Sequence, residues 1–495
     1  MRRSWSRLLP AGLALVIALA LYSATAARTI TTRFGGTDGG ELTAVALSGG
    51  VAHPPGYPTY LLLARLALWI PWGEPAARLA LLSALCGALA VAVTTLLVMA
   101  RSSTRMVGWG AGLYAGLSLA LCERLWSQAV IVEVYALHLL CMTICALLLW
   151  RWIATGRGWM LVLATYILGL GLGVHLTLAA LIPAGIAAWL VAPKRPRLTL
   201  AQALATLAAL AAGLAVYVLL PIWAAREAVP SWGEARTIGG FWQHVSAAEY
   251  RYLVGVVPWS QRLGRLGYVV RDLLVQPGPV ALLAAIGWGL PAGWRGDRSL
   301  LVLSGGVAFC SLLFAIGYGG ADSSVYLLPW TWAWCVWAGL GAAAIWGQIV
   351  GEHRQALRSG LAAILLVSIG WTLGARYNRL DLHADSAERE RVNALLSQLA
   401  PDALIFTSAD ADTFGAWYLQ RALGVRRDVL VIDTRLLRWP WYREQLIDPL
   451  PADNSQSICQ TLQTIDRPRY RVDDSGSVQA VVGAAPFDPA ICAAE

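Results

Sequence analysis

Charged residues are scarce in this sequence. Asp, Glu, Lys and Arg make up 14% of its 495 residues, while 57% are hydrophobic and the mean hydropathy is +0.58. Soluble domains carry roughly 25% charged residues, so this composition excludes a soluble or disordered chain and predicts a polytopic α-helical membrane protein. The net charge of +9 does not indicate a nucleic-acid partner. The basic residues are almost all Arg and form short clusters between apolar segments, as membrane topology requires.

Metal-ligand motifs are also missing. The eight Cys residues have no metal-ligand spacing, and no set of His, Asp and Glu has one either. We therefore assign no metal site, and dependence on a divalent metal stays open. Cys459 and Cys492 lie in a polar C-terminal segment, where a disulfide and two free thiols are about equally consistent if that segment is outside the cytoplasm.

Long apolar segments dominate the first three quarters of the chain. The first follows the basic stretch Met1–Arg7 and ends in small residues like a signal peptide, but its length favours a retained helix with a cytoplasmic N-terminus. The sequence predicts about eleven transmembrane helices: Leu8–Ala27, Ala77–Ala100, Val107–Cys122, Ile131–Trp150, Trp159–Val174, Leu176–Ala192, Thr199–Trp223, Pro279–Trp294, Leu300–Gly317, Val325–Gln348 and Ser359–Ala375.

The segment Tyr60–Trp72 is interpreted as an interfacial helix on the outer membrane face, because it is short, contains Arg65 and ends in Pro-Trp. With this assignment every basic cluster in the short loops falls on the cytoplasmic side, as the positive-inside rule requires. If the segment spanned the membrane, Arg101, Arg105 and every later cluster would lie on the wrong side. Residues 1–375 then form the transmembrane domain, with external loops at 28–76 and 224–277.

The composition becomes that of a soluble domain from Arg376 onward. Ala403–Thr407, Thr413–Leu423 and Val429–Asp433 predict a strand, a helix and a strand. Residues 376–495 are therefore expected to form a small α/β domain outside the membrane. No Gly-rich phosphate loop follows the first strand, and the expected role of the domain is acceptor docking or a lid.

With this topology, the unusual polar residues gather at the external face, and the centres of the predicted spans contain no Asp, Glu, Lys or Arg. A transporter usually needs ionisable groups near the midplane. A ring of such groups at one face instead fits an enzyme that takes a lipid-borne substrate from the outer leaflet. The candidate site residues are Asp38, Glu41, His53, Tyr57, Gln128, Glu133, Tyr135, His138, His175, Arg226, Trp232 and Tyr326, and Asp322 lies in the same external turn as Tyr326.

Each of these residues alone has a simpler interpretation. Asp38 and Glu41 form a capping-box pattern that needs only to start a helix. His53 precedes a Pro-Pro turn, His175 lies between two predicted helices, and Arg226 needs only to anchor the end of a span. Their agreement on one face of the membrane is what points to chemistry.

Several stretches resemble the GT-C glycosyltransferases, which are integral membrane enzymes that use polyprenyl-phosphate sugars. Within that class, the sequence resembles the protein O-mannosyltransferase-like branch (domain of unknown function 2723). The resemblance is carried by TDGGEL (37–42), AHPPGYPTYLLLARL (52–66), WSQAVIVEVYALH (126–138), GLGVHLT (171–177), PIWAAREAVPSWGEARTIGGFWQHV (221–245) and FTSADADTFGAWYLQRALGVRRDVLVIDTRLLRWPWYREQL (406–446). Residues 408–414, SADADTF, depart from the family pattern, which weakens any site assignment in the tail.

The resemblance implies a membrane glycosyltransferase that moves a sugar, expected to be mannose, from a polyprenyl-phosphate carrier to a hydroxyl with inversion. The expected acceptor is Ser or Thr of exported proteins. Its partners would be membrane lipid, the lipid-linked donor and the acceptor protein or polymer, and not nucleic acid. It would lie in the plasma (inner) membrane with its active site and C-terminal domain on the extracytoplasmic side. A polyprenyl-linked sugar transporter or flippase, and a GT-C enzyme that glycosylates a lipid or a cell-wall polymer, stay open as alternatives.

The chemistry of this transfer assigns roles to the candidate residues. The acceptor hydroxyl must lose a proton as it attacks, so a carboxylate base is required; Asp38 is the first choice and Glu41 the second. The lipid phosphate leaves as an anion, and Arg226 is expected to receive it. Substrate binding is expected from His53, Tyr57, Gln128, Glu133, Tyr135, His138, His175, Trp232 and Tyr326.

Overall fold

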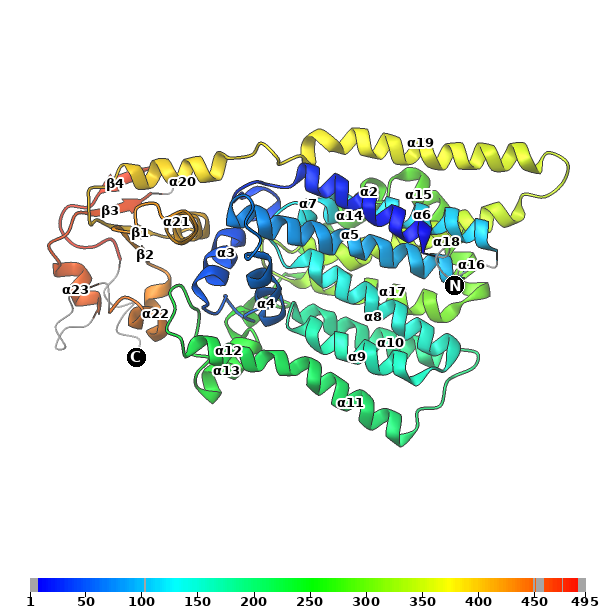
Figure 1. The fold of residues 1–495 in the computed structure, drawn as a ribbon, viewed down its shortest axis with the longest axis horizontal. Coiled ribbons are helices and arrows are strands. Elements are labelled where there is room, and N and C mark those ends of the chain that lie inside the picture. The colour runs from blue at the N-terminus through cyan, green and yellow to red at the C-terminus, as the bar shows by residue number, and fades with distance from the viewer. Residues whose placement is uncertain (1–7, 102–103, 448–449, 451–457, 474, 488–495) are drawn as a thin grey trace.

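Long helices form a bundle that takes up most of the molecule, and a small α/β unit lies at one end of it (Figure 1). The computed structural model describes residues 8–101, 104–447, 450, 458–473 and 475–487. The bundle contains α2 (Leu9–Thr25), α5 (Pro75–Arg101), α6 (Arg105–Ala120), α8 (Tyr135–Thr155), α9 (Gly158–Leu172), α10 (Leu181–Leu190), α11 (Leu200–Leu214), α17 (Arg298–Gly317), α18 (Leu328–Gln348) and α19 (Arg354–Leu380). The prediction of a mainly helical protein is confirmed.

Five described helices are long and apolar enough to cross a membrane, and a sixth span results if one bent pair is counted together. The five are Pro75–Arg101, Tyr135–Thr155, Leu200–Ala224, Arg298–Gly317 and Arg354–Leu380, and three shorter apolar helices accompany them at Leu9–Thr25, Gly158–Leu172 and Leu176–Leu190. These helices support an integral membrane protein. The predicted number of eleven spans is not confirmed, because several of the predicted segments are too short or too broken to cross a bilayer by this measure.

The bent pair lies where the sequence predicts the end of an external loop and a single span. Helix α14 (Trp259–Val275) meets the helical segment Pro279–Gly296 at an angle of 102°. That segment consists of α15 (Pro279–Ala284), a π-helical turn and α16 (Leu290–Gly296). The sequence does not reveal α14 as a distinct element because its Arg residues interrupt the apolar pattern.

Short helices at the same end of the bundle as the α/β unit position the candidate residues. They are α3 (Asp38–Ser48), α4 (Pro58–Ala67), α7 (Glu123–Ala129), α12 (Leu219–Ala224) and α13 (Ile238–Val245). The predicted interfacial helix corresponds to α4, which ends earlier than expected. Its Arg65 is held within the protein, since the guanidinium donates to the Gly50 carbonyl at 2.7 Å and lies 3.8 Å from the centre of the Trp223 ring.

The α/β unit contains a four-stranded sheet with the order β2-β1-β3-β4. Strands β1 (Leu404–Thr407) and β2 (Leu430–Asp433) are parallel and are joined by α21 (Asp410–Ala422), close to the predicted strand, helix and strand. The sequence did not predict β3 (Arg469–Val472), β4 (Val478–Ala480), α20 (Ala387–Ser397), α22 (Pro440–Glu444) or α23 (Ile458–Thr464). Cys492, one partner of the considered disulfide, lies outside the described residues.

Helix α3 packs closely between the α/β unit and the turn that contains Val132, because its first turn contains two glycines. A Cβ atom on Gly40 would lie 2.5 Å from the backbone oxygen of Phe414 in α21, and one on Gly39 would lie 3.0 Å from the Cβ of Val132. Only glycine permits both approaches without a shift of backbone. Further contacts hold the unit in place: the Tyr418 hydroxyl donates to Glu74 at 2.8 Å.

Candidate active site

A cavity of about 1410 Å³ opens where α3, the ends of the bundle helices and the α/β unit meet. Every candidate residue predicted from the sequence lines this cavity except Glu41 and Arg226. The residues come from six separate stretches of the chain, so the structure brings together what the sequence analysis placed on one face. Their individual roles stay predictions.

Asp38 begins α3 and faces the cavity, while Glu41 lies one turn later and is completely buried. Both oxygens of Glu41 bind the same residue: Oε1 accepts from the backbone N–H of His53 at 3.1 Å and Oε2 lies 3.0 Å from its ring Nδ1. The other ring nitrogen, Nε2, is 3.0 Å from the Tyr57 hydroxyl and 3.7 Å from Oδ2 of Asp38. The capping-box alternative is wrong, because the helix has Thr37 as its N-cap and no side-chain cap bond.

The charges of this group follow from its surroundings. Burial lowers the pKa of His53, but the carboxylates of Glu41 and Asp38 outweigh burial and raise it to about 9. Burial also raises the pKa of Asp38 to about 6, although His53 acts in the opposite direction. The Asp38 side chain is 40% exposed, but it is exposed to a cavity with protein walls, so desolvation is still appreciable. The raised pKa of His53 favours its imidazolium form at neutral pH, and of its two acidic neighbours Asp38 is the one that a substrate can reach.

Aromatic rings surround His53 on the side of the cavity near the α/β unit. The ring centres of Trp232 and Tyr250 lie 5.9 and 6.5 Å from that of His53. Trp232 also packs against two residues of the α/β unit, with ring centres 6.2 Å from Phe414 and 5.3 Å from Trp441. Phe414 and Asp410 line the cavity together with Asp38. The C-terminal unit therefore forms part of the wall of the site.

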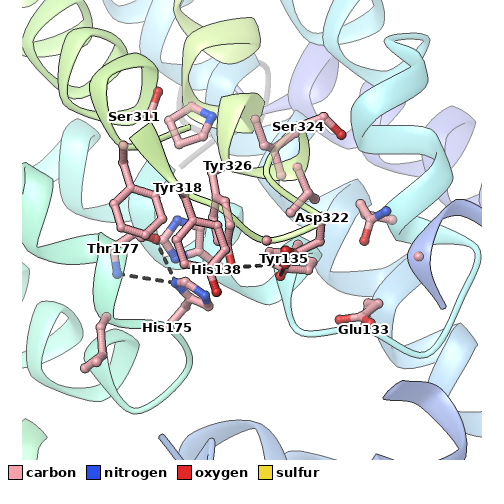
Figure 2. Close-up of a pocket in the computed structure, with 18 of the residues that line it drawn as sticks. Glu133, Tyr135, His138, His175, Thr177, Ser311, Tyr318, Asp322, Ser324 and Tyr326 are labelled. Carbon is pink, nitrogen blue, oxygen red and sulfur yellow. Dashed lines mark hydrogen bonds between the residues drawn. The ribbon is translucent and has the colours of Figure 1, made fainter. Parts of the chain in front are cut away.

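The side of the cavity toward the bundle is built from the turn before α8, the start of α8, and the turns near His175 and Asp322, as Figure 2 shows. Burial and the nearby Asp38 raise the pKa of Glu133 well above its ordinary value. One of its oxygens, Oε2, accepts from the backbone N–H of Val134 at 3.1 Å. The shift favours the neutral form of the Glu133 carboxyl relative to that of an exposed glutamate.

Gln128 has a structural contact as well as a place on the cavity wall. Its Nε2 donates to the backbone oxygen of Phe34 at 3.0 Å, which ties α7 to the first loop. The neighbouring Arg124 is buried and pairs with Asp272 at 2.9 Å. This arginine is therefore already neutralised within the protein.

Arg226, the predicted phosphate ligand, does not line the cavity. Its guanidinium lies near Gly49, at the C-terminal end of α3, where an added Cβ would meet Nη1 at 3.6 Å. Asp38 is at the other end of this helix, which is roughly 16 Å long at 1.5 Å per residue. A different arginine, Arg271 of α14, lines the cavity and is exposed, and no carboxylate of the described residues is within ion-pair distance of it.

Sequence reasoning missed several wall residues. Arg271, Tyr250, Tyr318, Asp410 and Phe414 line the cavity without having been predicted. The only signal for Arg271 is the pattern of Arg262, Arg265 and Arg271 on one amphipathic segment. Phe414 had no local signal, because its place depends on contact between residues nearly four hundred positions apart. Among the described residues, no group of three or more His, Cys, Asp or Glu side chains is placed to hold a metal ion.

The fold matches a solved structure with low sequence identity. The crystal structure of ArnT from Cupriavidus metallidurans bound to undecaprenyl phosphate superposes with a TM-score of 0.55, at 14% identity, over 94% of this chain and 93% of that chain. The same protein in the apo state gives a TM-score of 0.54. The two chains therefore share their overall fold.

Sequence comparisons narrow the class. Residues 38–200 match the family model of the Protein O-mannosyl-transferase TMEM260 N-terminal domain, and residues 388–482 match TMEM260-associated domain 2. Both stretches are thus similar to domains of the protein O-mannosyl-transferase TMEM260 family. Protein O-mannosyl-transferase TMEM260 of Mus musculus is 27% identical over 84% of this chain, and the protein of the same name from Dictyostelium discoideum is 23% identical over 82%. The chain spans 62% and 55% of the lengths of these relatives.

Proposed function

We propose that this protein is a membrane glycosyltransferase that moves a sugar, mannose being the expected one, from a polyprenyl-phosphate carrier to a hydroxyl group of an acceptor protein. The observation that carries the proposal is the cavity carboxylate Asp38, held beside a His53 that both Asp38 and Glu41 keep protonated. The names of the relatives support a protein acceptor and mannose. The fold shared with a protein solved with undecaprenyl phosphate supports a polyprenyl carrier.

In the proposed reaction, the acceptor oxygen attacks the anomeric carbon of the sugar while its proton passes to Asp38. The bond between the anomeric carbon and the phosphate oxygen breaks, and the polyprenyl phosphate leaves with the bonding electrons. Attack from the face opposite the leaving phosphate inverts the anomeric centre. An ionised Asp38 with a pKa of about 6 is suited to this role, because a general base is most useful when its pKa lies near the working pH.

The remaining residues divide between the two substrates. Glu41 has no access to the cavity, so we assign it the positioning of His53 and assign proton transfer to Asp38 alone. The leaving phosphate develops negative charge and needs an unpaired cation. Arg271 meets that requirement, whereas the earlier candidate Arg226 lies at the far end of α3. The wall formed by Trp232, Phe414 and Asp410 is then left for the acceptor.

We infer that the cavity opens on the extracytoplasmic side of the plasma (inner) membrane. The opposite end of the bundle carries basic side chains such as Arg101, which pairs with Asp297 at 3.4 Å. Basic residues favour the cytoplasmic face. The C-terminal unit, which lies at the cavity end, is then extracytoplasmic as well.

A reconstitution experiment tests the function. The full chain in proteoliposomes is given polyprenyl-phosphate mannose and a Ser/Thr-containing peptide, and mass spectrometry measures the gain of one hexose on the peptide. Transfer to the peptide is expected. Movement of the lipid-linked sugar across the bilayer without transfer would support a flippase, and transfer only to lipid or polysaccharide hydroxyls would support the third alternative.

A further inference from the structure

Asp322 presents a carboxylate of fixed orientation to the cavity. It lies in the turn between α17 and α18 and is exposed. Its Oδ2 accepts hydrogen bonds from the hydroxyls of Tyr135 at 3.1 Å and Tyr326 at 3.0 Å. Because both bonds end on one oxygen, the carboxylate cannot rotate freely. The other oxygen, Oδ1, has no hydrogen-bond partner among the described residues, so it is free to bind a ligand.

Aromatic side chains gather on the same side of the cavity as Asp322 (Figure 2). The ring of Tyr326 is central: its centre lies 5.9 Å from Tyr135, 5.3 Å from Tyr318 and 5.4 Å from His175. Phe314 closes one side at 4.9 Å from Tyr326. A carboxylate set among aromatic faces matches a sugar ring, whose C–H faces pack on aromatic rings while its hydroxyls need hydrogen-bond partners.

A hydrogen-bond donor faces the same space. The backbone N–H of Thr177 donates to Nδ1 of His175 at 3.3 Å, so this nitrogen is an acceptor and the neutral ring carries its proton on Nε2. The ring of Tyr135 lies 5.7 Å from that of His175, while its hydroxyl binds Asp322. Tyr135 thus contacts both the acceptor Asp322 and the donor His175. Hydroxyl groups, which both donate and accept, suit such a pair.

Charge decides which part of the lipid-linked donor can occupy this place. A carboxylate repels a phosphate group, and the exposed Arg271 is available elsewhere in the cavity for it. Asp322 also acts on Asp38, since its charge contributes to raising the pKa of that carboxyl. Both acidic residues line the same cavity.

We propose that Asp322 is a specificity-determining residue that accepts hydrogen bonds from hydroxyls of the donor sugar, and that the site takes a neutral hexopyranose and rejects an anionic uronic acid. This inference rests on the proposed function. The inference adds a donor-binding residue and a class of donor sugar to that proposed function. Tyr135 and Tyr326 act as positioning residues, because they hold Asp322 and their rings form the walls.

The test compares Asp322→Asn with wild type in the full chain. Binding of polyprenyl-phosphate mannose, its monodeoxy analogues and polyprenyl-phosphate uronic acid is measured by quenching of tryptophan fluorescence, and transfer kinetics are measured alongside. A hydrogen bond to a charged group is typically worth a factor of about 10 to 100 in affinity. In wild type we expect at least one deoxy analogue to bind weaker by this factor. In Asp322→Asn that difference should shrink to less than about threefold and the uronic acid should bind better.

Asp466→Asn is the matched control, because Asp466 is an exposed residue of the C-terminal unit outside the cavity. Asp322→Glu, which keeps the charge, is the second variant in case the Asn variant does not fold, and it should still reject the uronic acid. A folded Asp322→Asn with the same sugar discrimination as wild type would overturn the inference, as would tight binding of the uronic acid by wild type. Failure of wild type to transfer, with selective binding intact, would refute the proposed function only.

Discussion

Replacing Glu41 by Gln should change the pH dependence of transfer more than the structure of the site. The variant keeps the shape of the side chain but removes its charge, and an amide cannot accept from both the backbone N–H and the ring N–H of His53 as the carboxylate does. Without the charge of Glu41, the protonated form of the His53 ring is no longer favoured over the neutral form. Its pKa should fall from about 9 to the ordinary 6.5 or below, which corresponds to about 3 kcal/mol at 1.36 kcal/mol per pKa unit.

The assay is kcat/KM for sugar transfer between pH 5 and 10. Wild type should show a bell-shaped profile, because activity rises as Asp38 ionises near pH 6 and falls as His53 loses its proton near pH 9. In Glu41→Gln the alkaline limb should move to near or below pH 6.5. The free energy of unfolding should follow the same pattern. In wild type, the raised pKa of His53 adds stability that is fully present below pH 6.5 and is lost as the pH rises through about 9. Glu41→Gln should lack this contribution.

Glu227→Gln is the control for this experiment. Glu227 is 76% exposed and pairs with Arg236 on the surface, so its neutralisation should leave the profile unchanged. An alkaline limb that stays near pH 9 in a folded Glu41→Gln variant would refute the assignment of Glu41 as the residue that keeps His53 charged.

Two further predictions concern the walls of the cavity. Gly40→Ala should lower the free energy of unfolding by about 1–3 kcal/mol and reduce kcat, because the new Cβ would meet the Phe414 backbone oxygen at 2.5 Å and push α3 away from α21. Gly374→Ala is the control, because no atom lies within 4 Å of its added Cβ. Equal melting temperatures for both variants would contradict this packing. Arg271→Ala should weaken binding of polyprenyl phosphate by about tenfold or more, whereas Arg226→Ala should change it by less than about twofold; a titration that gave the reverse order would return the phosphate to Arg226.

Local sequence patterns predicted the candidate residues better than they predicted the way those residues interact. The motifs TDGGEL and HPPGYP identified Asp38, Glu41 and His53, and the structure joins the three through the hydrogen bonds of Glu41 and the ion pair of Asp38 with His53. The sequence did not predict which carboxylate is buried. Both residues lie in the first turn of α3, but the helix places Glu41 in the interior and Asp38 on the cavity wall. The roles of all three remain predictions.

The limits of sequence reasoning come from long-range packing. Arg226 follows an apolar helix as a phosphate ligand would, but the chain turns after α12 and brings it near Gly49, at the end of α3 away from Asp38. Gly40 and Phe414 show the opposite case, because neither residue signals a contact that places the C-terminal unit in the cavity wall. The predicted count of eleven spans is not confirmed, and the sequence did not reveal the 102° bend between α14 and the segment Pro279–Gly296.

The central claim, that Asp38 removes the proton of the acceptor hydroxyl, is tested most directly by single-turnover transfer from polyprenyl-phosphate mannose to a Ser/Thr peptide with Asp38→Asn. The variant keeps the size of the side chain, so folding and donor binding should match wild type. The rate of the chemical step should fall by about 10²- to 10⁴-fold. A rate within about threefold of wild type, in a variant that binds the donor normally, would contradict the account.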